Sequence, residues 1–296
     1  MSIDDIKNVL VVGAGTLGLR IALRCAFDGY QVKMYDISED QLAVAGQMQS
    51  RLTADFLKKG MITTKMVEQA KSGLAVTTDI DEAVTNVDLV SESVIENIDI
   101  KKAFYADFAP RLKKGTILTT NTSYLLPSMM LESIAEPENF CALHFHDVFN
   151  QTVVDIMPHP LTAPAVTDLL MEFGRRIKQI PVYIKKESPG YIFNSMLMAI
   201  IGQAASLHLD DVGSIQDIDR SFMGNFNTPL GPFGILDQIG LDTAWHVVNA
   251  LSDDQSVQFA TVLKSYLDQG KLGYKSGEGF YSYPDPEYSQ ASFLRG

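Results

Sequence analysis

The sequence contains few cysteines and no long run of apolar residues. Its 296 residues include two cysteines, Cys25 and Cys141, which lie in apolar segments at no metal-ligand spacing. We interpret both as buried residues of a protein from a reducing compartment, and we expect no metal site. The most apolar helical stretch, residues 191–207, is interrupted by polar residues, and residues 1–7 are polar and acidic, unlike a signal peptide. We therefore expect a cytoplasmic protein without a membrane segment.

Positive charge is also scarce. The chain has 24 Lys and Arg residues against 36 Asp and Glu residues, which gives a net charge of -12. Nucleic-acid binders usually carry a basic excess, so we expect no nucleic-acid partner. Hydrophobic residues make up 46% of the chain, which is typical of a globular protein rather than a disordered one. The length indicates one large or two ordinary domains.

Strand and helix patterns alternate over the first part of the chain. Short apolar runs predict strands, and residues recurring at helical spacing predict the helices between them. Ser38 and Gln41 have the spacing of a capping box at the start of one long helix, which is followed by a lysine-bearing helical stretch to Lys71. This alternation predicts a Rossmann-type, doubly wound and mostly parallel sheet. The expected strands are residues 9–12, 31–35, 87–90, 116–119, 141–145, 153–157 and 180–184.

The character of the sequence changes at residues 185–190, where charge, proline and glycine mark a boundary. We expect an NAD-binding domain over residues 1–186 and an all-helical substrate and dimerisation domain over residues 187–296. Residues 191–207 are apolar on nearly every side of the expected helix, which predicts burial all round. Part of that burial is expected in a homodimer interface; burial within one subunit is the alternative.

The glycines after the first strand match the dinucleotide-binding pattern. Gly13, Gly15 and Gly18 have G-x-G-x-x-G spacing between a strand and a helix, with Thr16 and Leu17 inside the motif. The first glycine permits a tight turn, the second lets the backbone approach a pyrophosphate, and the third lets helix and strand pack closely. Asp36 ends the second strand, 23 residues after Gly13. An acid there binds the ribose hydroxyls and repels a 2′-phosphate, so we predict NAD rather than NADP.

Polar residues follow three other predicted strands, at the edge where ligands bind in such sheets. They are Glu92 and Glu96, then residues 121–123, then residues 144–147. Oxidation of an alcohol needs a base for the hydroxyl proton, and a histidine suits that role near neutral pH. His144 ends a strand at this edge, and Asp155 is the nearest carboxylate able to return beside it. A single histidine is more often structural than catalytic, so the position of His144 decides the assignment.

These residues belong to an ordered series of motifs that resembles the short-chain L-3-hydroxyacyl-CoA dehydrogenase family over nearly the whole chain. The resemblance implies reversible oxidation, by NAD, of the 3-hydroxy group of an acyl-CoA in fatty acid metabolism. The matching stretches are residues 11–18, Glu96 with 100–102, 121–123, 143–145, 188–194, 229–233, Asp237, 240–243 and 273–281.

The resemblance also implies a role for each matching residue. His144 takes the position of the catalytic histidine, and Asp155 lies near that of the glutamate that orients it. Ser123 and Asn194 correspond to the groups that hold the reacting oxygen. The cofactor contacts fall on residues 13–18, Asp36, Glu96, Lys101 and Asn121, with Glu96 and Lys101 on the nicotinamide side. Lys58 and Lys59 lie where the family binds coenzyme A, although a solvated helix end explains them equally well.

The chain departs from the family pattern around the histidine. The usual His-Phe-Phe-Asn-Pro is replaced by His144-Phe145-His146-Asp147-Val148, and the acid is an aspartate that follows one residue sooner. A negative charge at Asp147 disfavours a nearby enolate or carboxylate, and His146 has Asp147 as a candidate partner. Two alternatives therefore stay open: a dehydrogenase of a free hydroxy acid, such as L-gulonate, or of carnitine; and a nucleotide-binding sensor or structural protein without catalysis.

Overall fold

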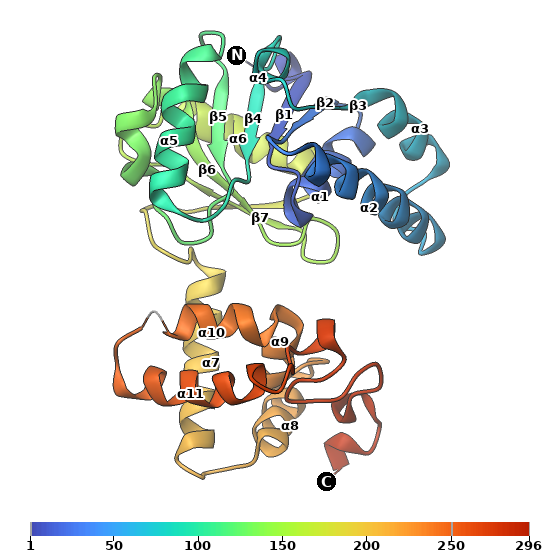
Figure 1. Cartoon of the computed structure of the whole chain (residues 1–296), viewed down its shortest axis with the longest axis vertical. Helices are drawn as coiled ribbons and strands as arrows, with labels where there is room; N and C mark the ends of the chain where they lie inside the picture. The colour runs from blue at the N-terminus through green and yellow to red at the C-terminus, as the bar shows by residue number, and fades with distance from the viewer. Residues whose placement is uncertain (1, 250, 296) are drawn as a thin grey trace. The chain divides into compact units, whose positions relative to one another are not determined.

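The computed structural model describes residues 2–249 and 251–295 (Figure 1). The chain divides into two compact units, Met1–Ile192 and Phe193–Gly296. The division lies a few residues beyond the boundary that the sequence predicts after residue 186.

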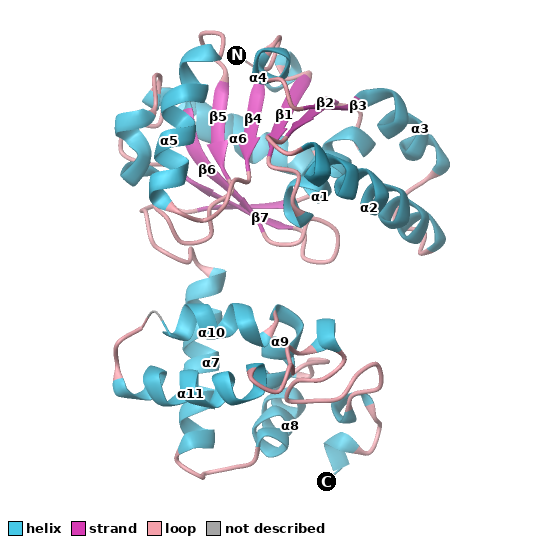
Figure 2. Cartoon of the chain, viewed as in Figure 1, coloured by secondary structure: helices cyan, strands magenta, loops and turns pink. Residues whose placement is uncertain are grey.

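The first unit is built on an eight-stranded sheet with the order β3-β2-β1-β4-β5-β6-β7-β8 (Figure 2). Neighbouring strands are parallel except for β6 and β7, which are antiparallel. The predicted doubly wound, mostly parallel sheet is therefore confirmed. The strands are β1 (Asn8–Val12), β2 (Gln31–Tyr35), β3 (Leu74–Thr77), β4 (Leu89–Glu92), β5 (Ile117–Thr120), β6 (Phe140–Phe145), β7 (Val153–Met157) and β8 (Ile180–Tyr183).

Helices cover both faces of this sheet, which explains why its central strands are apolar throughout. Alternate residues of β1 point to opposite faces: Val9 and Val11 belong to a core shared with α1 and α6, and Leu10 and Val12 to a core shared with α4 and α5. The helices of this unit are α1 (Thr16–Phe27), α2 (Glu39–Lys58), α3 (Thr64–Gly73), α4 (Ile80–Val84), α5 (Ile98–Phe108) and α6 (Pro164–Arg176).

The second unit is helical, as the sequence predicts. Two buried carboxylates hold its segments together. Asp219 of α8 accepts hydrogen bonds from the N–H groups of Phe233 and Gly234 in α9, and Asp237 of α9 accepts from those of Phe280 and Tyr281 in the tail. The helices are α7 (Phe193–Leu209), α8 (Ile215–Phe226), α9 (Pro232–Ile239), α10 (Leu241–Asn249) and α11 (Asp254–Leu267).

Two expectations about local structure are wrong. β3, an edge strand whose residues are half-buried or exposed, is absent from the predicted strands. The Ser38 side chain accepts from Gln41 N–H, but the Gln41 amide donates to the Ala14 carbonyl instead of closing the capping box. The helix expected at residues 191–207 begins at Phe193. Within one chain it is only partly buried, because Met196 is 55% exposed and Ile200 is 38% exposed, so its expected burial in a dimer interface stays a prediction.

Candidate active site

The glycine loop connects β1 to α1 and is shaped by close backbone packing. Gly13 has a φ of +95°, and a Cβ at this position would lie 2.6 Å from the Ser93 carbonyl oxygen. A Cβ at Gly18 would lie 2.0 Å from the Gly13 carbonyl oxygen. At Gly15, by contrast, a Cβ would meet nothing within 4 Å, and no described side chain caps the α1 N-terminus. An open backbone at the start of a helix fits a pyrophosphate, so the loop fits NAD.

Asp36 follows β2 and reaches this loop. Its Oδ2 accepts a hydrogen bond of 2.8 Å from Ala14 N–H, and its Oδ1 accepts one of 3.0 Å from Ser38 N–H. The carboxylate is half-buried and therefore lies beside the loop with a face toward solvent. This is the arrangement that the sequence motif predicts for an acid that binds an adenosine ribose.

Glu92, the last residue of β4, forms a buried ion pair with Lys101 of α5. The Lys101 Nζ lies 2.5 Å from a Glu92 carboxylate oxygen, and both side chains are at most 1% exposed. Thr120 and Tyr105 also donate to Glu92, which leaves this carboxylate well satisfied. Lys101 in addition donates to the Val94 carbonyl. Lys101, a residue predicted to contact the cofactor, is thus buried in the structure and stabilises the loop that follows β4.

Glu96 and Asn121 hold neighbouring strand ends together. One Glu96 oxygen accepts from the Thr122 hydroxyl and from the N–H groups of Ser123 and Tyr124. The Asn121 side chain accepts from Phe145 N–H at 2.7 Å and donates to the Ser93 hydroxyl. These contacts fix the position of the loop that carries Ser123, next to the end of β6.

Ser123, His144 and Asp155 form a continuous hydrogen-bonded series. The Ser123 Oγ lies 3.3 Å from His144 Nε2, and His144 Nδ1 lies 3.2 Å from Asp155 Oδ2. His144 and Asp155 are directly opposite in the antiparallel pairing of β6 and β7. The structure therefore brings together these three residues singled out in the sequence, and the antiparallel turn explains how an acid 11 residues along returns beside the histidine.

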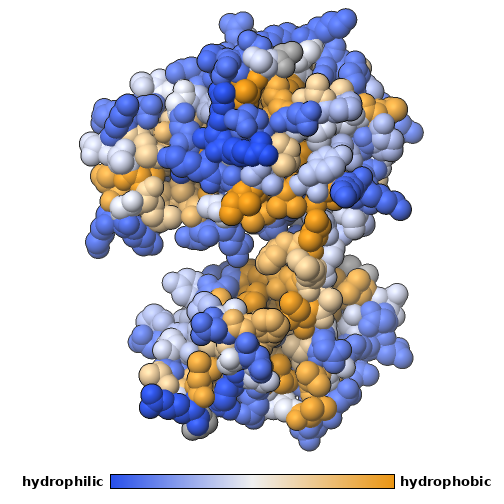
Figure 3. Space-filling model, turned by 180° about the vertical axis from the view of Figure 1, so that it is seen from behind, coloured by the Kyte–Doolittle hydropathy of each residue, from blue (hydrophilic) through white to orange (hydrophobic). Residues whose placement is uncertain are grey.

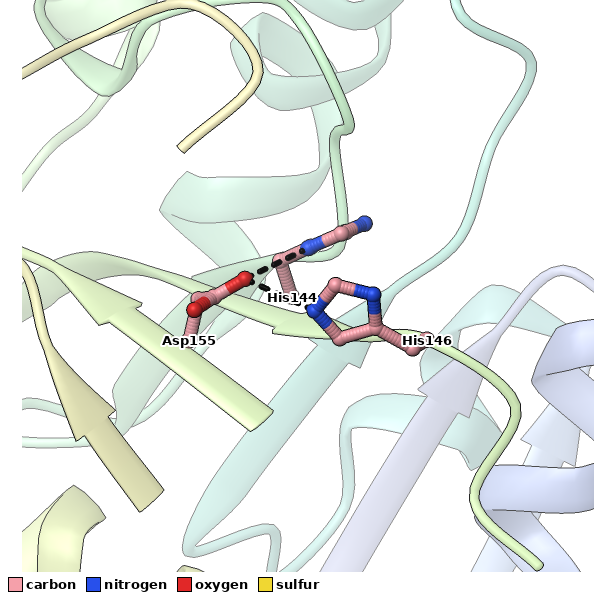
Figure 4. A group of neighbouring side chains, drawn as sticks. All are labelled: His144, His146 and Asp155. Atoms are coloured by element: carbon pink, nitrogen blue, oxygen red, sulfur yellow. Dashed lines mark hydrogen bonds and ion pairs between the residues drawn. The ribbon is translucent and has the colours of Figure 1, made fainter. Parts of the chain in front are cut away.

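A second histidine shares the same carboxylate oxygen. His146 Nε2 lies 2.9 Å from Asp155 Oδ2, and Figure 4 shows both imidazoles pointing at Asp155. The pairing of His146 with Asp147 that the sequence suggests is therefore wrong. Asp147 instead forms an ion pair with Arg20 of α1 and accepts from the N–H groups of Phe149 and Asn150. Because Arg20 is 127 residues away in the sequence, no local pattern could identify this pair.

Burial sets the protonation of the site. Burial lowers the pKa of His144 from its ordinary value, and the neighbouring His146 imidazole acts in the same direction, against the opposing effect of Asp155. Burial alone would raise the pKa of Asp155, but hydrogen bonds from both histidines outweigh it and lower the pKa. The site therefore pairs a neutral imidazole with a charged carboxylate near neutral pH.

Tyr191 completes the surroundings of His144 and was not identified as a site residue in the sequence. Its ring stacks on the imidazole, with centroids 4.6 Å apart and planes 11° from parallel, and its hydroxyl donates to the Thr122 carbonyl. Its φ of +55° lets the chain turn directly after Gly190, and Gly190-Tyr191 within the family-like stretch was the available signal. Asn194, which the sequence predicts to bind the reacting oxygen, lies in the first turn of α7, in the second unit.

The model of the NAD-binding domain of 3-hydroxyacyl-CoA dehydrogenases matches residues 8–188, and the model of their C-terminal domain matches residues 190–283. The chain belongs to the 3-hydroxyacyl-CoA dehydrogenase family. A probable 3-hydroxyacyl-CoA dehydrogenase of Caenorhabditis elegans is 31% identical over 291 residues, covering 95% of this chain and 97% of the relative. The mitochondrial hydroxyacyl-coenzyme A dehydrogenase of Rattus norvegicus is 30% identical, with coverage of 94% and 91%.

Solved structures agree with this family assignment. A diketoreductase described as acting on dicarbonyl compounds superposes with a TM-score of 0.89 at 36% identity, covering 94% of this chain and 99% of its own. An (S)-3-hydroxybutyryl-CoA dehydrogenase of Ralstonia eutropha has a TM-score of 0.83 at 26% identity, covering 95% and 100%. The chain is an NAD-dependent oxidoreductase of this family. Among residues 2–249 and 251–295, no helix has the length and apolar character needed to cross a membrane.

Proposed function

We propose that this protein interconverts a 3-hydroxyacyl-CoA and a 3-oxoacyl-CoA, with His144 as the general base in the oxidation. The hydrogen-bonded series of Ser123, His144 and Asp155 at the ligand edge of the sheet carries this proposal. The family and its named relatives support the acyl-CoA class of substrate. Such a reaction belongs to fatty acid metabolism.

Each residue of the series has a distinct part in the reaction. The Ser123 hydroxyl binds the substrate's hydroxyl oxygen, and His144 Nε2 accepts the proton that leaves this oxygen. The Asp155 carboxylate accepts from His144 Nδ1–H, which fixes the tautomer and stabilises the imidazolium that forms. NAD bound at the glycine loop would supply the acceptor for the hydride that leaves the carbon. The alcohol thereby becomes a ketone, and its proton resides on His144.

The low pKa of His144 suits this role in the oxidation direction. An imidazole buried to this degree is neutral near pH 7, so its Nε2 is available as a proton acceptor. Besides burial, the groups that influence the pKa of His144 are Asp155, His146 and Glu96. Removing the carboxylate would leave the imidazolium without its partner.

The negative charge of Asp147 is compatible with an acyl-CoA substrate. An unpaired negative charge in this loop would repel an enolate or a carboxylate, but the Arg20 guanidinium offsets the Asp147 charge. Lys58 and Lys59 lie at the exposed end of α2, where a coenzyme A phosphate would find positive charge. Lys59 also forms an ion pair with Asp55, but both side chains are exposed, so the pair is weak and lowers that attraction only slightly.

A dicarbonyl substrate without coenzyme A is the second candidate. The observation that favours it is the diketoreductase, whose structure is 36% identical to this chain over 94% of its length. Acetoacetyl-CoA and a free diketone present the same pair of carbonyl groups, so the Ser123 and His144 site would treat their reacting oxygens alike.

A substrate panel distinguishes these candidates. NADH oxidation is followed at one pH with acetoacetyl-CoA, pentane-2,4-dione, dehydrocarnitine and the oxo acid of L-gulonate. We expect the largest kcat/KM with acetoacetyl-CoA. A larger value with the free diketone would replace the proposed substrate class, and turnover with none of the four would contradict the enzyme assignment to these substrates.

We further propose that the protein is a cytoplasmic homodimer. The support for the dimer is a row of exposed apolar side chains on α7, formed by Phe193, Met196 and Ile200 at helical spacing. The support for a reducing compartment is that Cys25 and Cys141 are both free thiols in the structure. Cell fractionation and light scattering test these two statements separately.

A further inference from the structure

Two histidines and an aspartate converge at the end of β6. His144 and His146 are two residues apart, so an extended chain places both side chains on the same side. Asp155 is directly opposite His144 on β7. As Figure 4 shows, the two rings approach the carboxylate from different directions and both reach its Oδ2. His146 is the member of this group that the family pattern lacks, because phenylalanine is usual at its position.

We infer that His144, His146 and Asp155 form a binding site for a divalent transition-metal ion of the zinc type. Each of the three residues offers one ligand atom, and these atoms all lie within 4.8 Å of one another. The ring nitrogens next to the Asp155 carboxylate are His144 Nδ1 and His146 Nε2. Imidazole nitrogen and carboxylate oxygen are the ligands that Zn²⁺ accepts alongside thiolate. Three protein ligands with a fourth position open are the usual number for a zinc ion that retains a water molecule.

The distances fit such an ion with little movement. Zinc lies about 2.1 Å from nitrogen and oxygen ligands, so two ligands at a tetrahedral angle are about 3.4 Å apart. In the structure the shared oxygen is 3.2 Å from the His144 nitrogen and 2.9 Å from the His146 nitrogen. Each nitrogen therefore has to move only a few tenths of an ångström away from the Asp155 oxygen for the ion to bind. The side chains are only 5%, 7% and 2% exposed, so the ligands are already desolvated and held in place.

Charge and tautomer also permit binding. The carboxylate supplies one negative charge, and each imidazole can bind the ion through the nitrogen that now donates to Asp155. A neutral imidazole that binds an ion through one nitrogen carries its proton on the other, so neither ring has to lose a proton. Binding is therefore compatible with neutral pH.

The ion and the proposed catalysis exclude each other. In the metal-bound state His144 Nε2 carries a proton, so it no longer accepts one from the substrate, and Asp155 no longer orients the ring. We therefore expect reversible inhibition of the dehydrogenase by zinc. This consequence rests on the proposed function of His144, whereas binding of the ion does not.

Calorimetric titration of the chelator-treated full chain with zinc chloride tests the site. We expect one ion per chain. In His146→Phe the affinity should fall by at least about tenfold, since even the loss of a hydrogen bond to a ligand typically weakens metal sites about 10–100-fold. His146→Gln provides a second variant that keeps a polar side chain. His246→Phe removes an exposed imidazole from α10 and serves as the matched control, with unchanged affinity expected.

Titration of NADH fluorescence establishes that each variant is folded. Absence of zinc binding to the wild type, or equal affinity in wild type and both His146 variants, would overturn the site. Inhibition is measured relative to each variant's own metal-free rate and is reversed with EDTA. Zinc binding at this site without loss of turnover would leave the site standing and contradict the proposed role of His144.

Discussion

At the scale of single residues, Asp36 combines two interactions that can be separated by substitution. Its carboxylate holds Ala14 N–H of the glycine loop and supplies the charge that would repel a 2′-phosphate. Asp36→Asn keeps one of the two acceptor oxygens and removes the charge. We expect the ratio of kcat/KM for NADH to that for NADPH to fall about tenfold, which corresponds to about 1.4 kcal/mol. Asp40→Asn, in the first turn of α2, is the control, and an unchanged ratio in Asp36→Asn would refute the assignment.

The residues of the site were predictable to different degrees. Ser123 and His144 could be found because each lies at or near the end of a strand recognisable from its apolar run, and Asp155 because it is the nearest carboxylate on the following strand. The partner of His146 could not be predicted, because both Asp147 and Asp155 are candidates. Only the fold shows that Asp155 faces the ring and that Asp147 pairs with Arg20. Tyr191 was missed because its stacking on His144 depends on a backbone turn. The φ of +55° at this turn cannot be inferred from the residue type.

At the scale of elements, Asp88 joins the starting ends of β1 and β4. It accepts from the N–H groups of Lys7 and Asn8 and pairs with the Lys113 ammonium at 2.6 Å. Although burial raises its pKa, these partners outweigh that effect and lower the pKa below the ordinary 3.8. The stabilisation is therefore present above the ordinary value and is lost as the pH falls through the lower folded value.

Asp88→Asn should accordingly destabilise the protein by about 1–3 kcal/mol at pH 7. The difference from wild type should shrink below about pH 4, as the wild-type carboxyl also becomes protonated. Urea unfolding at several pH values measures both effects. Asp55→Asn, which breaks an exposed ion pair, should cost less than about 1 kcal/mol. A difference that grows with falling pH would contradict the account of Asp88.

The tail of the second unit packs closely against α9. A Cβ at Gly279 would lie 2.1 Å from Asp237 Oδ1, so Gly279→Ala must displace a carboxylate that holds two backbone N–H groups. We expect a loss of about 2–4 kcal/mol in the free energy of unfolding. The fluorescence of Trp245, in α10 of the same unit, follows this transition.

The matched control is Gly224→Ala within α8, where a Cβ would meet nothing within 4 Å. This substitution should be neutral or stabilising by about 0.5–1 kcal/mol, because alanine favours a helix over glycine. Equal effects of the two substitutions would show that the tail is not packed as described.

Elements differ in how clearly the sequence indicates them. The central strands are continuous apolar runs because both faces of the sheet are covered, and such runs are easy to recognise. The edge strand β3 lacks that signal, since none of its residues is fully buried. For helix α7 the apolar signal is strong, and it indicates burial. The sequence does not show whether this helix is buried by its own unit or by another chain.

At the scale of the whole molecule, the exposed row on α7 predicts association. Met196→Glu places a charge in the proposed dimer interface, and we expect the mass by light scattering to fall from about 65 kDa to the 32.6 kDa of one chain. Val76→Glu, on the exposed edge strand β3, should leave the mass unchanged. A wild-type protein that is monomeric at micromolar concentration would contradict the dimer.

The two-unit organisation was predictable because the sequence pattern changes after residue 184. Strand and helix patterns alternate before this residue, and only helical patterns follow it. The direction of β7 was not, because an antiparallel pair and a crossover can connect strands of similar sequence. That direction matters for function, since the antiparallel pairing of β6 and β7 brings Asp155 opposite His144.

The central claim is that His144 is the base of an NAD-dependent dehydrogenase. The most direct test is kcat for acetoacetyl-CoA reduction by His144→Asn, together with NADH affinity from fluorescence titration. Because general acid–base catalysis contributes about 10²–10⁴-fold, we predict a loss of kcat in that range with NADH affinity unchanged. Undiminished kcat in a variant that binds NADH normally would contradict the account.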